Sequence, residues 1–219
     1  PGIDHMSAME LIDRIKSKNG QITGFKSHCG GLIAPESDTN PWHYKISWNP
    51  RNIILAGKAG AVYLENGLEK HVPYPSIFEN CAEISVPNWG QLSYYPNRDS
   101  LSYINTYQLE GVQNFIRTTL RHPSFSKGWN VIVQMGLTNE EEFEKPMNTI
   151  ADWFQHQLNS KKIKSIWDTI QQDPLIKNQF EFLAFNTNDT IPDACLTNAS
   201  VLQWILETKW SLNKTDKDA

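Results

Sequence analysis

The chain has 219 residues, of which 39% are hydrophobic and 20% charged, and its mean hydropathy is -0.49. This composition is typical of a globular chain with a full hydrophobic core, and it argues against a disordered or membrane-embedded protein. The formal net charge is -4 and the basic residues are scattered, which argues against a nucleic-acid partner because such partners need a basic surface.

The first third of the chain predicts two helices separated by short strands. Ser7 and Glu10 have the spacing of a capping box, and Gly20 is a typical helix stop. Asn49-Pro50 is a helix start, with Asn as the cap and Pro at the first helical position. The expected elements are a helix over 7–19, a strand over 21–29 that runs into the turn Cys29-Gly30-Gly31, a strand over 43–48 and a helix over 51–58.

The middle of the chain predicts strands. Asn66-Gly67 lies between residues 61–64 and 68–72 and is the strongest short hairpin signal. From residue 112 to 120 two sets of residues alternate, and each set mixes apolar with polar side chains, which predicts a long strand buried in part on both faces. The sets are Val112, Asn114, Ile116, Thr118 and Leu120, and Gln113, Phe115, Arg117 and Thr119. The expected strands are 61–64, 68–72, 83–86, 92–95 and 112–120.

The last third of the chain predicts helices, separated by Asn, Asp and Pro. They are expected over 126–135, 147–158, 163–171, 175–185 and 200–210. The predicted fold class is therefore α+β: a mixed β-sheet with flanking helices over residues 1–121, and a C-terminal helical layer over 122–219. We expect the first domain to bind substrate and to dimerise.

Several familiar sites are missing from the sequence. There is no G-x-G-x-x-G and no G-x-x-x-x-G-K-[ST], so the chain shows no phosphate-binding loop of its own. Three widely spaced cysteines, Cys29, Cys81 and Cys195, do not fit a disulfide framework and favour a reducing compartment. No apolar run reaches the roughly 20 residues that span a bilayer, and no secretory signal is evident. We therefore expect a cytoplasmic protein without a membrane partner.

Polar residues gather at four places in the sequence: Asp4-His5, His28-Cys29, His43-Tyr44-Lys45 with Trp48 and Arg51, and Asn97-Arg98-Asp99-Ser100. A metal ion held by His5, His28, Cys29 and His43 is one reading, but the spacings fit no zinc pattern, so we predict no metal. In the alternative reading the histidines are ordinary hydrogen-bonding residues and the cysteine is a small hydrophobe.

Arg51 stands at a predicted helix start, where a cation is disfavoured by the helix dipole. A bound carboxylate would compensate, because the planar guanidinium matches a carboxylate in bidentate fashion. A surface ion pair with a nearby Asp or Glu is the alternative explanation.

A set of longer motifs carries a family resemblance. In order they are Pro1-Gly2-Ile3-Asp4-His5-Met6, Ser27-His28-Cys29-Gly30-Gly31-Leu32, Ala34-Pro35-Glu36, Asn40-Pro41, Tyr44-Lys45, Ser47-Trp48, Arg51, Pro96-Asn97-Arg98-Asp99-Ser100 and Thr119-Leu120-Arg121. Over roughly the first 125 residues, their order and spacing resemble the saccharopine dehydrogenase family. His28 and Ile33 depart from the family pattern, which usually has Tyr and Pro there, and the helical tail resembles the family more weakly.

The resemblance implies a catalytic and dimerisation domain inserted into a Rossmann domain, which both ends of the longer chain would form. It implies an NAD or NADP cofactor bound mainly by that other domain, which is absent from this chain. The reaction implied is reversible cleavage of saccharopine, a small amino-acid substrate, to glutamate and aminoadipate semialdehyde in lysine metabolism. We expect this portion alone to be inactive.

The resemblance also suggests roles for individual residues. His5, Lys45 and Asp4 are candidates for proton transfer, although Lys45 could instead be a structural cation. The substrate-binding candidates are Arg51, Asn97, Arg98, Asp99, Cys29, Gly30, Tyr44 and Trp48, with the two arginines expected to bind substrate carboxylates.

Two alternatives stay open: a carboxynorspermidine dehydrogenase-like enzyme, and a non-catalytic module that binds a carboxylate and assembles subunits. We expect a homodimer, because the strand over 112–120 and the aromatic Trp89, Tyr94 and Tyr95 offer apolar surface.

Overall fold

The computed structural model describes residues 2–217, so Pro1 of the first motif and Asp218 lie outside the described residues. The chain divides into two compact units. Unit 1 comprises Pro1–Gly30 and Gly57–Arg121, and unit 2 comprises Gly31–Ala56 and His122–Ala219. Residues 31–56 group with the helical unit and not with the sheet.

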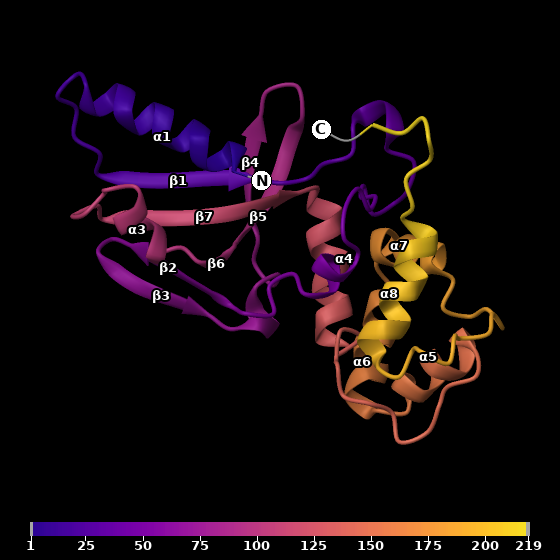
Figure 1. Cartoon of the computed structure of the whole chain (residues 1–219). Helices are drawn as coiled ribbons and strands as arrows, with labels where there is room; N and C mark the ends of the chain where they lie inside the picture. The colour runs from indigo at the N-terminus through magenta and orange to yellow at the C-terminus, as the bar shows by residue number, and fades with distance from the viewer. Residues whose placement is uncertain (1, 218–219) are drawn as a thin grey trace. The chain divides into compact units, whose positions relative to one another are not determined.

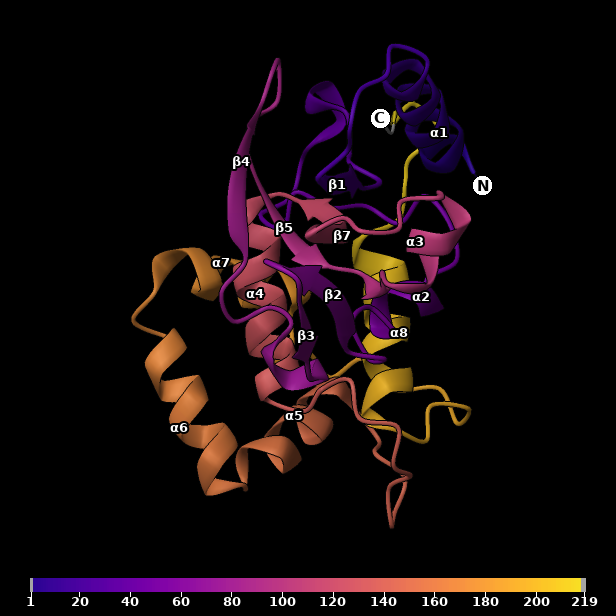
Figure 2. The same ribbon diagram turned by 90° about the vertical axis from the view of Figure 1, so that its left-hand side faces the viewer.

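Unit 1 is built on a mixed sheet, which has seven strands within the described residues. The central strand β7 (Asn114–Arg121) pairs in parallel with β1 (Gly24–Cys29) along one side. On its other side it pairs antiparallel with β2 (Ala61–Glu65) and with β5 (Gly90–Pro96), as Figure 2 shows. The remaining strands are β3 (Leu68–Val72), β4 (Ala82–Val86) and β6 (Arg98–Asp99). The α+β class and the mixed sheet are thus confirmed.

Helix α1 (Ile3–Lys16) lies along β1 in unit 1 (Figure 1). Its buried residues Ala8 and Ile12 pack with Tyr107 and Phe115 into the core of this unit. The helix begins four residues before the predicted start at Ser7, because Gly2 takes φ 109° and caps it. The predicted capping box of Ser7 and Glu10 is therefore wrong, since both residues lie inside the helix.

The hairpin prediction is confirmed. Asn66 and Gly67 have φ of 53° and 73°, and they join β2 to β3 in the register Glu65↔Leu68. The strands predicted over 83–86, 92–95 and 112–120 are present as β4, β5 and β7. A short 3₁₀ turn, η2 (Tyr74–Ser76), and a short helix, α3 (Ser102–Thr106), complete unit 1.

Two predictions for residues 43–58 are wrong. Residues 43–48 form no strand and contribute only an isolated bridge between Ile46 and Ser211. The reason is that Tyr44 is 3% exposed and packs against Phe125 and Trp210, which draws this segment into the aromatic core of unit 2. The predicted helix over 51–58 shrinks to the four residues of α2 (Arg51–Ile54), preceded in this unit by the turn η1 (Pro35–Ser37).

The five helices predicted for the last third of the chain are confirmed within a few residues at each end. They are α4 (Pro123–Gln134), α5 (Ile150–Leu158), α6 (Lys161–Ile170), α7 (Pro174–Leu183) and α8 (Asn198–Lys209). Fully buried indoles from Trp42, Trp129 and Trp210 make the centre of this unit aromatic. In the described part of the chain, no helix is both long enough and apolar enough to cross a membrane.

Candidate functional site

The first turn of α1 carries Asp4 and His5, the two proton-transfer candidates of unit 1. An acidic residue is favoured there by the helix dipole. Asp4 Oδ2 lies 3.9 Å from His5 Nε2, and the side chains are 25% and 35% exposed. One carboxylate and one imidazole therefore lie together at a partly open position, where both can meet a ligand and exchange protons with it.

Three residues that the sequence did not single out surround this pair. Arg117 of β7 places Nη2 3.4 Å from Asp4 Oδ2, and its guanidinium lies 3.9 Å from the ring centroid of Tyr103. His5 stacks on Tyr103 and places Nδ1 2.5 Å from the hydroxyl oxygen of Tyr107. Burial raises the pKa of Tyr107, so its hydroxyl stays protonated at neutral pH. We call these five residues, Asp4, His5, Tyr103, Tyr107 and Arg117, the Asp4 cluster.

The segment Asn97–Ser100 holds the backbone of this cluster. The Asn97 amide donates to the Arg117 carbonyl at 2.9 Å, and the Arg117 amide donates to Ser100 Oγ at 3.0 Å. Asp99 Oδ1 accepts from the amides of Leu101 and Ser102, and so starts the helix that carries Tyr103. A structural role therefore accounts for Asp99 and for the Asn97 backbone. Arg98 is exposed at φ 51° and stays a candidate for binding substrate.

His28, Cys29 and Gly30 end strand β1. His28 Nδ1 lies 2.7 Å from Thr118 Oγ1, and burial, with a smaller effect of Lys26, lowers the pKa of His28. The Cys29 thiol is free and exposed. A Cβ at Gly30 would lie 2.4 Å from the Leu120 carbonyl oxygen, so glycine is required there for packing, apart from any contact with substrate.

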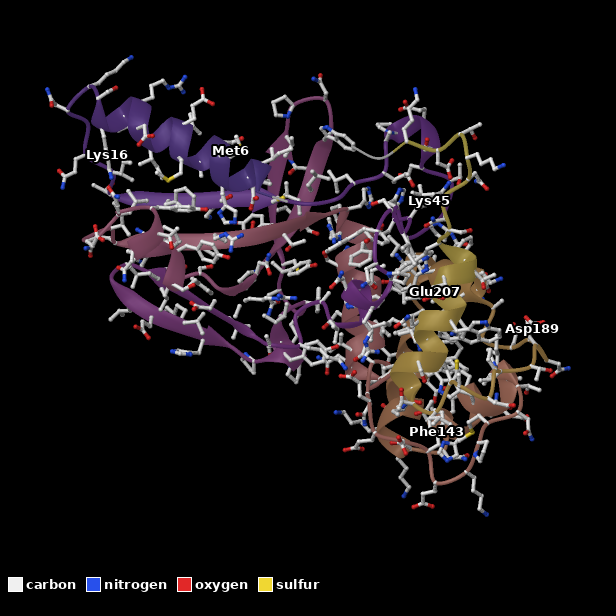
Figure 3. All side chains as sticks on the ribbon, viewed as in Figure 1. Met6, Lys16, Lys45, Phe143, Asp189 and Glu207 are labelled. Carbon is white, nitrogen blue, oxygen red and sulfur yellow. The ribbon has the colours of Figure 1, made fainter. Side chains whose placement is uncertain are left out.

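The candidates in unit 2 are engaged by other side chains. Lys45 Nζ donates to Asp216 Oδ2 at 2.8 Å, with side chains only 5% and 10% exposed, beside the C-terminal segment (Figure 3). This hydrogen bond is the main cause that lowers the pKa of Asp216. The arrangement favours the structural-cation alternative for Lys45. Tyr44 is a core residue, as described above, and its ring is hidden from solvent.

Arg51 pairs with Glu140, and both side chains are about 40% exposed, 38% and 44%. This matches the surface ion pair that was the alternative explanation for Arg51. Because α2 has only four residues, it has little helix dipole that a bound anion at Arg51 would need to compensate. Trp48, by contrast, is 58% exposed and available for contact with a ligand.

His43 belongs to a separate pair in unit 2. Its Nδ1 lies 2.5 Å from Asp38 Oδ2, and its ring stacks on His122 at 3.8 Å between centroids. Burial and then His43 lower the pKa of His122, while Asp38 raises it. Across residues 2–217, no group of three or more His, Cys, Asp or Glu side chains is placed to hold a metal ion.

The comparisons with known proteins agree with one another. The family described as "Saccharopine dehydrogenase C-terminal domain" matches residues 1–219. The chain is 31% identical over 241 residues to the alpha-aminoadipic semialdehyde synthase of Arabidopsis thaliana, covering 100% of the chain and 23% of that protein. It is 37% identical over 142 residues to the NADP(+), L-glutamate-forming saccharopine dehydrogenase of Pyricularia oryzae, covering 65% of the chain and 32% of that protein.

A solved structure has the same fold. The apo, histidine-tagged saccharopine dehydrogenase (L-Glu forming) from Saccharomyces cerevisiae matches with a TM-score of 0.86 and 26% identity, covering 100% of this chain and 52% of that one. The chain thus spans about half of this structure and less of the two curated relatives. Because the family match covers the whole sequence, the chain belongs to the saccharopine dehydrogenase C-terminal domain family.

Proposed function

We propose that this chain is the substrate-binding and dimerisation portion of a saccharopine dehydrogenase-like oxidoreductase. The whole protein would convert saccharopine, NAD(P)⁺ and water to glutamate, aminoadipate semialdehyde and NAD(P)H, as part of lysine metabolism. The observation that carries the proposal is the Asp4–His5 pair, which lies partly open on the first turn of α1 in a chain whose relatives bear these enzyme names.

The proposed reaction needs proton transfers that the Asp4–His5 pair can serve. Hydride leaves a carbon attached to the secondary amine of saccharopine, and the resulting imine is hydrolysed by water. A proton must leave the attacking water, and another must reach the departing amine of glutamate. Asp4 Oδ2 and His5 Nε2, 3.9 Å apart, can contact the same polar atom and share these transfers. Lys45 is the weaker candidate, because its amine is already bonded to Asp216.

The nicotinamide, when bound, accepts the hydride. This sequence has no glycine-rich phosphate loop, so we assign the nucleotide mainly to a domain outside the chain. The L-glutamate-forming relatives from Pyricularia oryzae, Schizosaccharomyces pombe and Saccharomyces cerevisiae are named for NADP(+), which makes NADP the first cofactor to test.

The substrate carries several carboxylates, and Arg51 and Arg98 are proposed to bind them. Arg98 is exposed within unit 1. Arg51 would exchange Glu140 for a substrate carboxylate, an exchange that conserves the charge balance of the guanidinium. Cys29, Asn97 and Trp48 are proposed to complete the contacts.

We also propose a homodimer in the cytoplasm. Of the three aromatic residues expected to offer surface, Tyr95 is 4% exposed and packs on Phe78, whereas Trp89 and Tyr94 are half-buried. Sedimentation of the full-length protein at micromolar concentration tests the dimer. Some relatives, such as that of Rattus norvegicus, are named as mitochondrial, so the compartment needs imaging of the tagged protein.

The decisive experiment is turnover by the full-length protein that contains this chain. Saccharopine with NADP or NAD should yield NAD(P)H and glutamate in equal amounts. Asp4→Asn should lower kcat by about a hundredfold or more, because it removes a proton acceptor. Asp13→Asn, on the exposed face of the same helix, is the matched control and should retain activity. Absence of turnover with either nucleotide would refute the proposal.

The alternative of a non-catalytic module rests on a specific observation. Lys45 and Arg51 are each neutralised by a carboxylate of the chain itself, as in a domain that only assembles subunits. A full-length protein that dimerises and binds glutamate, yet reduces no nucleotide, would select this alternative. Residues 1–219 alone are expected to show no turnover under either reading.

A further inference from the structure

We propose that Arg117 is a positioning residue that acts through Asp4. The inference rests on the proposed function only where it gives Asp4 a chemical role. Arg117 is 16% exposed at its side chain and faces a carboxylate that is 25% exposed, so the ion pair is shielded from solvent more than an ordinary surface pair. Attraction between opposite charges is stronger in such a setting than in water.

The geometry selects one oxygen of Asp4. Arg117 Nη2 and His5 Nε2 both approach Oδ2, at 3.4 Å and 3.9 Å. Because a cation engages this oxygen, the carboxylate is held in one orientation, with Oδ2 between the guanidinium and the imidazole. Catalytic groups depend strongly on such orientation, since a displacement of about 1 Å can cost roughly a hundredfold in rate.

Arg117 itself is fixed at both its backbone and its side chain. Its carbonyl accepts a hydrogen bond from the Asn97 amide, and its amide donates to Ser100 Oγ. Strand pairing aligns it with Ser27 of β1. The guanidinium lies over the Tyr103 ring, a stacking contact that a lysine amine cannot reproduce. The segment Asn97–Ser100 therefore contributes to the site by holding Arg117, in addition to any contact with substrate.

Tyr107 completes the arrangement on the side of His5. Since its hydroxyl stays protonated, it can donate to His5 Nδ1, which leaves the ring proton on Nε2, the nitrogen that faces Asp4. Arg117 of β7 thus orients the carboxylate oxygen of Asp4, and Tyr107, which directly follows α3, orients the imidazole of His5.

Kinetics of the full-length protein test the inference. Arg117→Gln should lower kcat by about tenfold to a hundredfold with KM changed by less than about threefold, because orientation is lost and binding is not. Arg117→Lys keeps the charge and should fall between Gln and wild type. In an Asp4→Asn background, Arg117→Gln should have less than about a twofold further effect, since the two residues act as one unit. Additive effects, or a loss confined to KM, would overturn the inference.

A second readout does not depend on turnover. The full-length protein is treated with a water-soluble carbodiimide and an amine at mildly acidic pH, and coupling at Asp4 is quantified by peptide mass spectrometry. Arg117→Gln should increase coupling at Asp4 by about threefold or more, because the shielding cation is gone. Arg14→Gln is the control, because Arg14 is exposed and lies on α1 with Asp4, and it should leave coupling at Asp4 unchanged. Circular dichroism checks that both variants are folded.

The two readouts separate the possible failures. If wild type turns over no saccharopine but Asp4 coupling rises in Arg117→Gln, the proposed function fails and the positioning role stands. Unchanged coupling at Asp4 in a folded Arg117→Gln protein would overturn the positioning role, whatever the activity.

Discussion

The two units treat their polar candidate residues in different ways. In unit 1, backbone features fix the positions: Gly2 caps α1 at φ 109°, Gly30 admits the Leu120 carbonyl, and Asn97–Ser100 hold Arg117. The side chains of Asp4 and His5 then stay partly open. In unit 2, Lys45 and Arg51 are held by ion pairs with carboxylates of the same unit.

This difference shows why a charged residue in a motif can either stabilise the fold or take part in a functional site. A cation that is paired and buried, such as Lys45, contributes to the fold and is poorly placed to exchange protons with a substrate. Asp4 is also paired with a cation, Arg117, but its carboxylate and the neighbouring His5 stay partly exposed. Substitutions at Gly30, Arg51, Arg98, Lys45 and Glu140 would show whether this difference between the units holds.

Gly30→Ala should destabilise unit 1 through its backbone. The added Cβ would lie 2.4 Å from a backbone oxygen, which cannot move without displacing β7. We expect a loss of about 2–3 kcal/mol in the free energy of unfolding, measured by urea denaturation. The neighbouring Gly31→Ala is the matched control, because its Cβ would meet nothing within 4 Å, and it should cost less than about 0.5 kcal/mol. Equal losses would contradict this account.

Arg51→Lys and Arg98→Lys test each arginine separately as a residue that binds a substrate carboxylate. Each change keeps the charge but loses the bidentate fork, so saccharopine binding should weaken by on the order of 2 kcal/mol, roughly thirtyfold. KM and kcat of the full-length variants are measured, with nucleotide affinity as the control. If KM and kcat are unchanged in Arg51→Lys but not in Arg98→Lys, Arg51 has only a structural role, in its ion pair with Glu140.

Lys45→Met tests the buried pair of unit 2 through its pH dependence. Lys45 lowers the pKa of Asp216 below the ordinary value of 3.8, so the folded state binds this proton less readily than the unfolded state. The stabilisation is complete above the ordinary value and is lost as pH falls through the lowered one. As pH falls below about 4, Lys45→Met should therefore lose less stability than the wild type, as measured by acid unfolding followed by circular dichroism.

The exposed Lys214→Met provides the control for the same C-terminal segment. It should reproduce the acid dependence of the wild type. An identical acid limb in Lys45→Met would mean that the pair contributes nothing to stability.

Glu140→Gln should have the smallest effect on stability. Its pair with Arg51 is about 40% exposed on both sides, at 38% and 44%, and surface pairs contribute about 0–1 kcal/mol. If Glu140 competes with a substrate carboxylate for Arg51, KM for saccharopine should fall by up to about threefold in the full-length protein. A rise in KM would instead place Glu140 in the substrate site.

Local sequence patterns predicted the hairpin, the five late helices and the family. Asn66-Gly67 predicted the hairpin because only a few residue types accept positive φ at both turn positions. Apolar periodicity predicted the five late helices because a 3.6-residue repeat identifies the face of a helix that is buried. The motifs around Asp4 and Arg98 carried the resemblance that the family match bears out.

Which charged side chains meet depends on tertiary packing and could not be predicted from local patterns. Arg117 and Asp4 lie 113 positions apart, and Lys45 and Asp216 lie 171 apart, so no local pattern relates them. Tertiary packing also explains why residues 43–48 do not form the predicted strand. Burial of Tyr44 among aromatic rings outweighs a weak local preference for extended structure. Backbone preference acts over a few residues, whereas an ion pair forms wherever folding brings two side chains together.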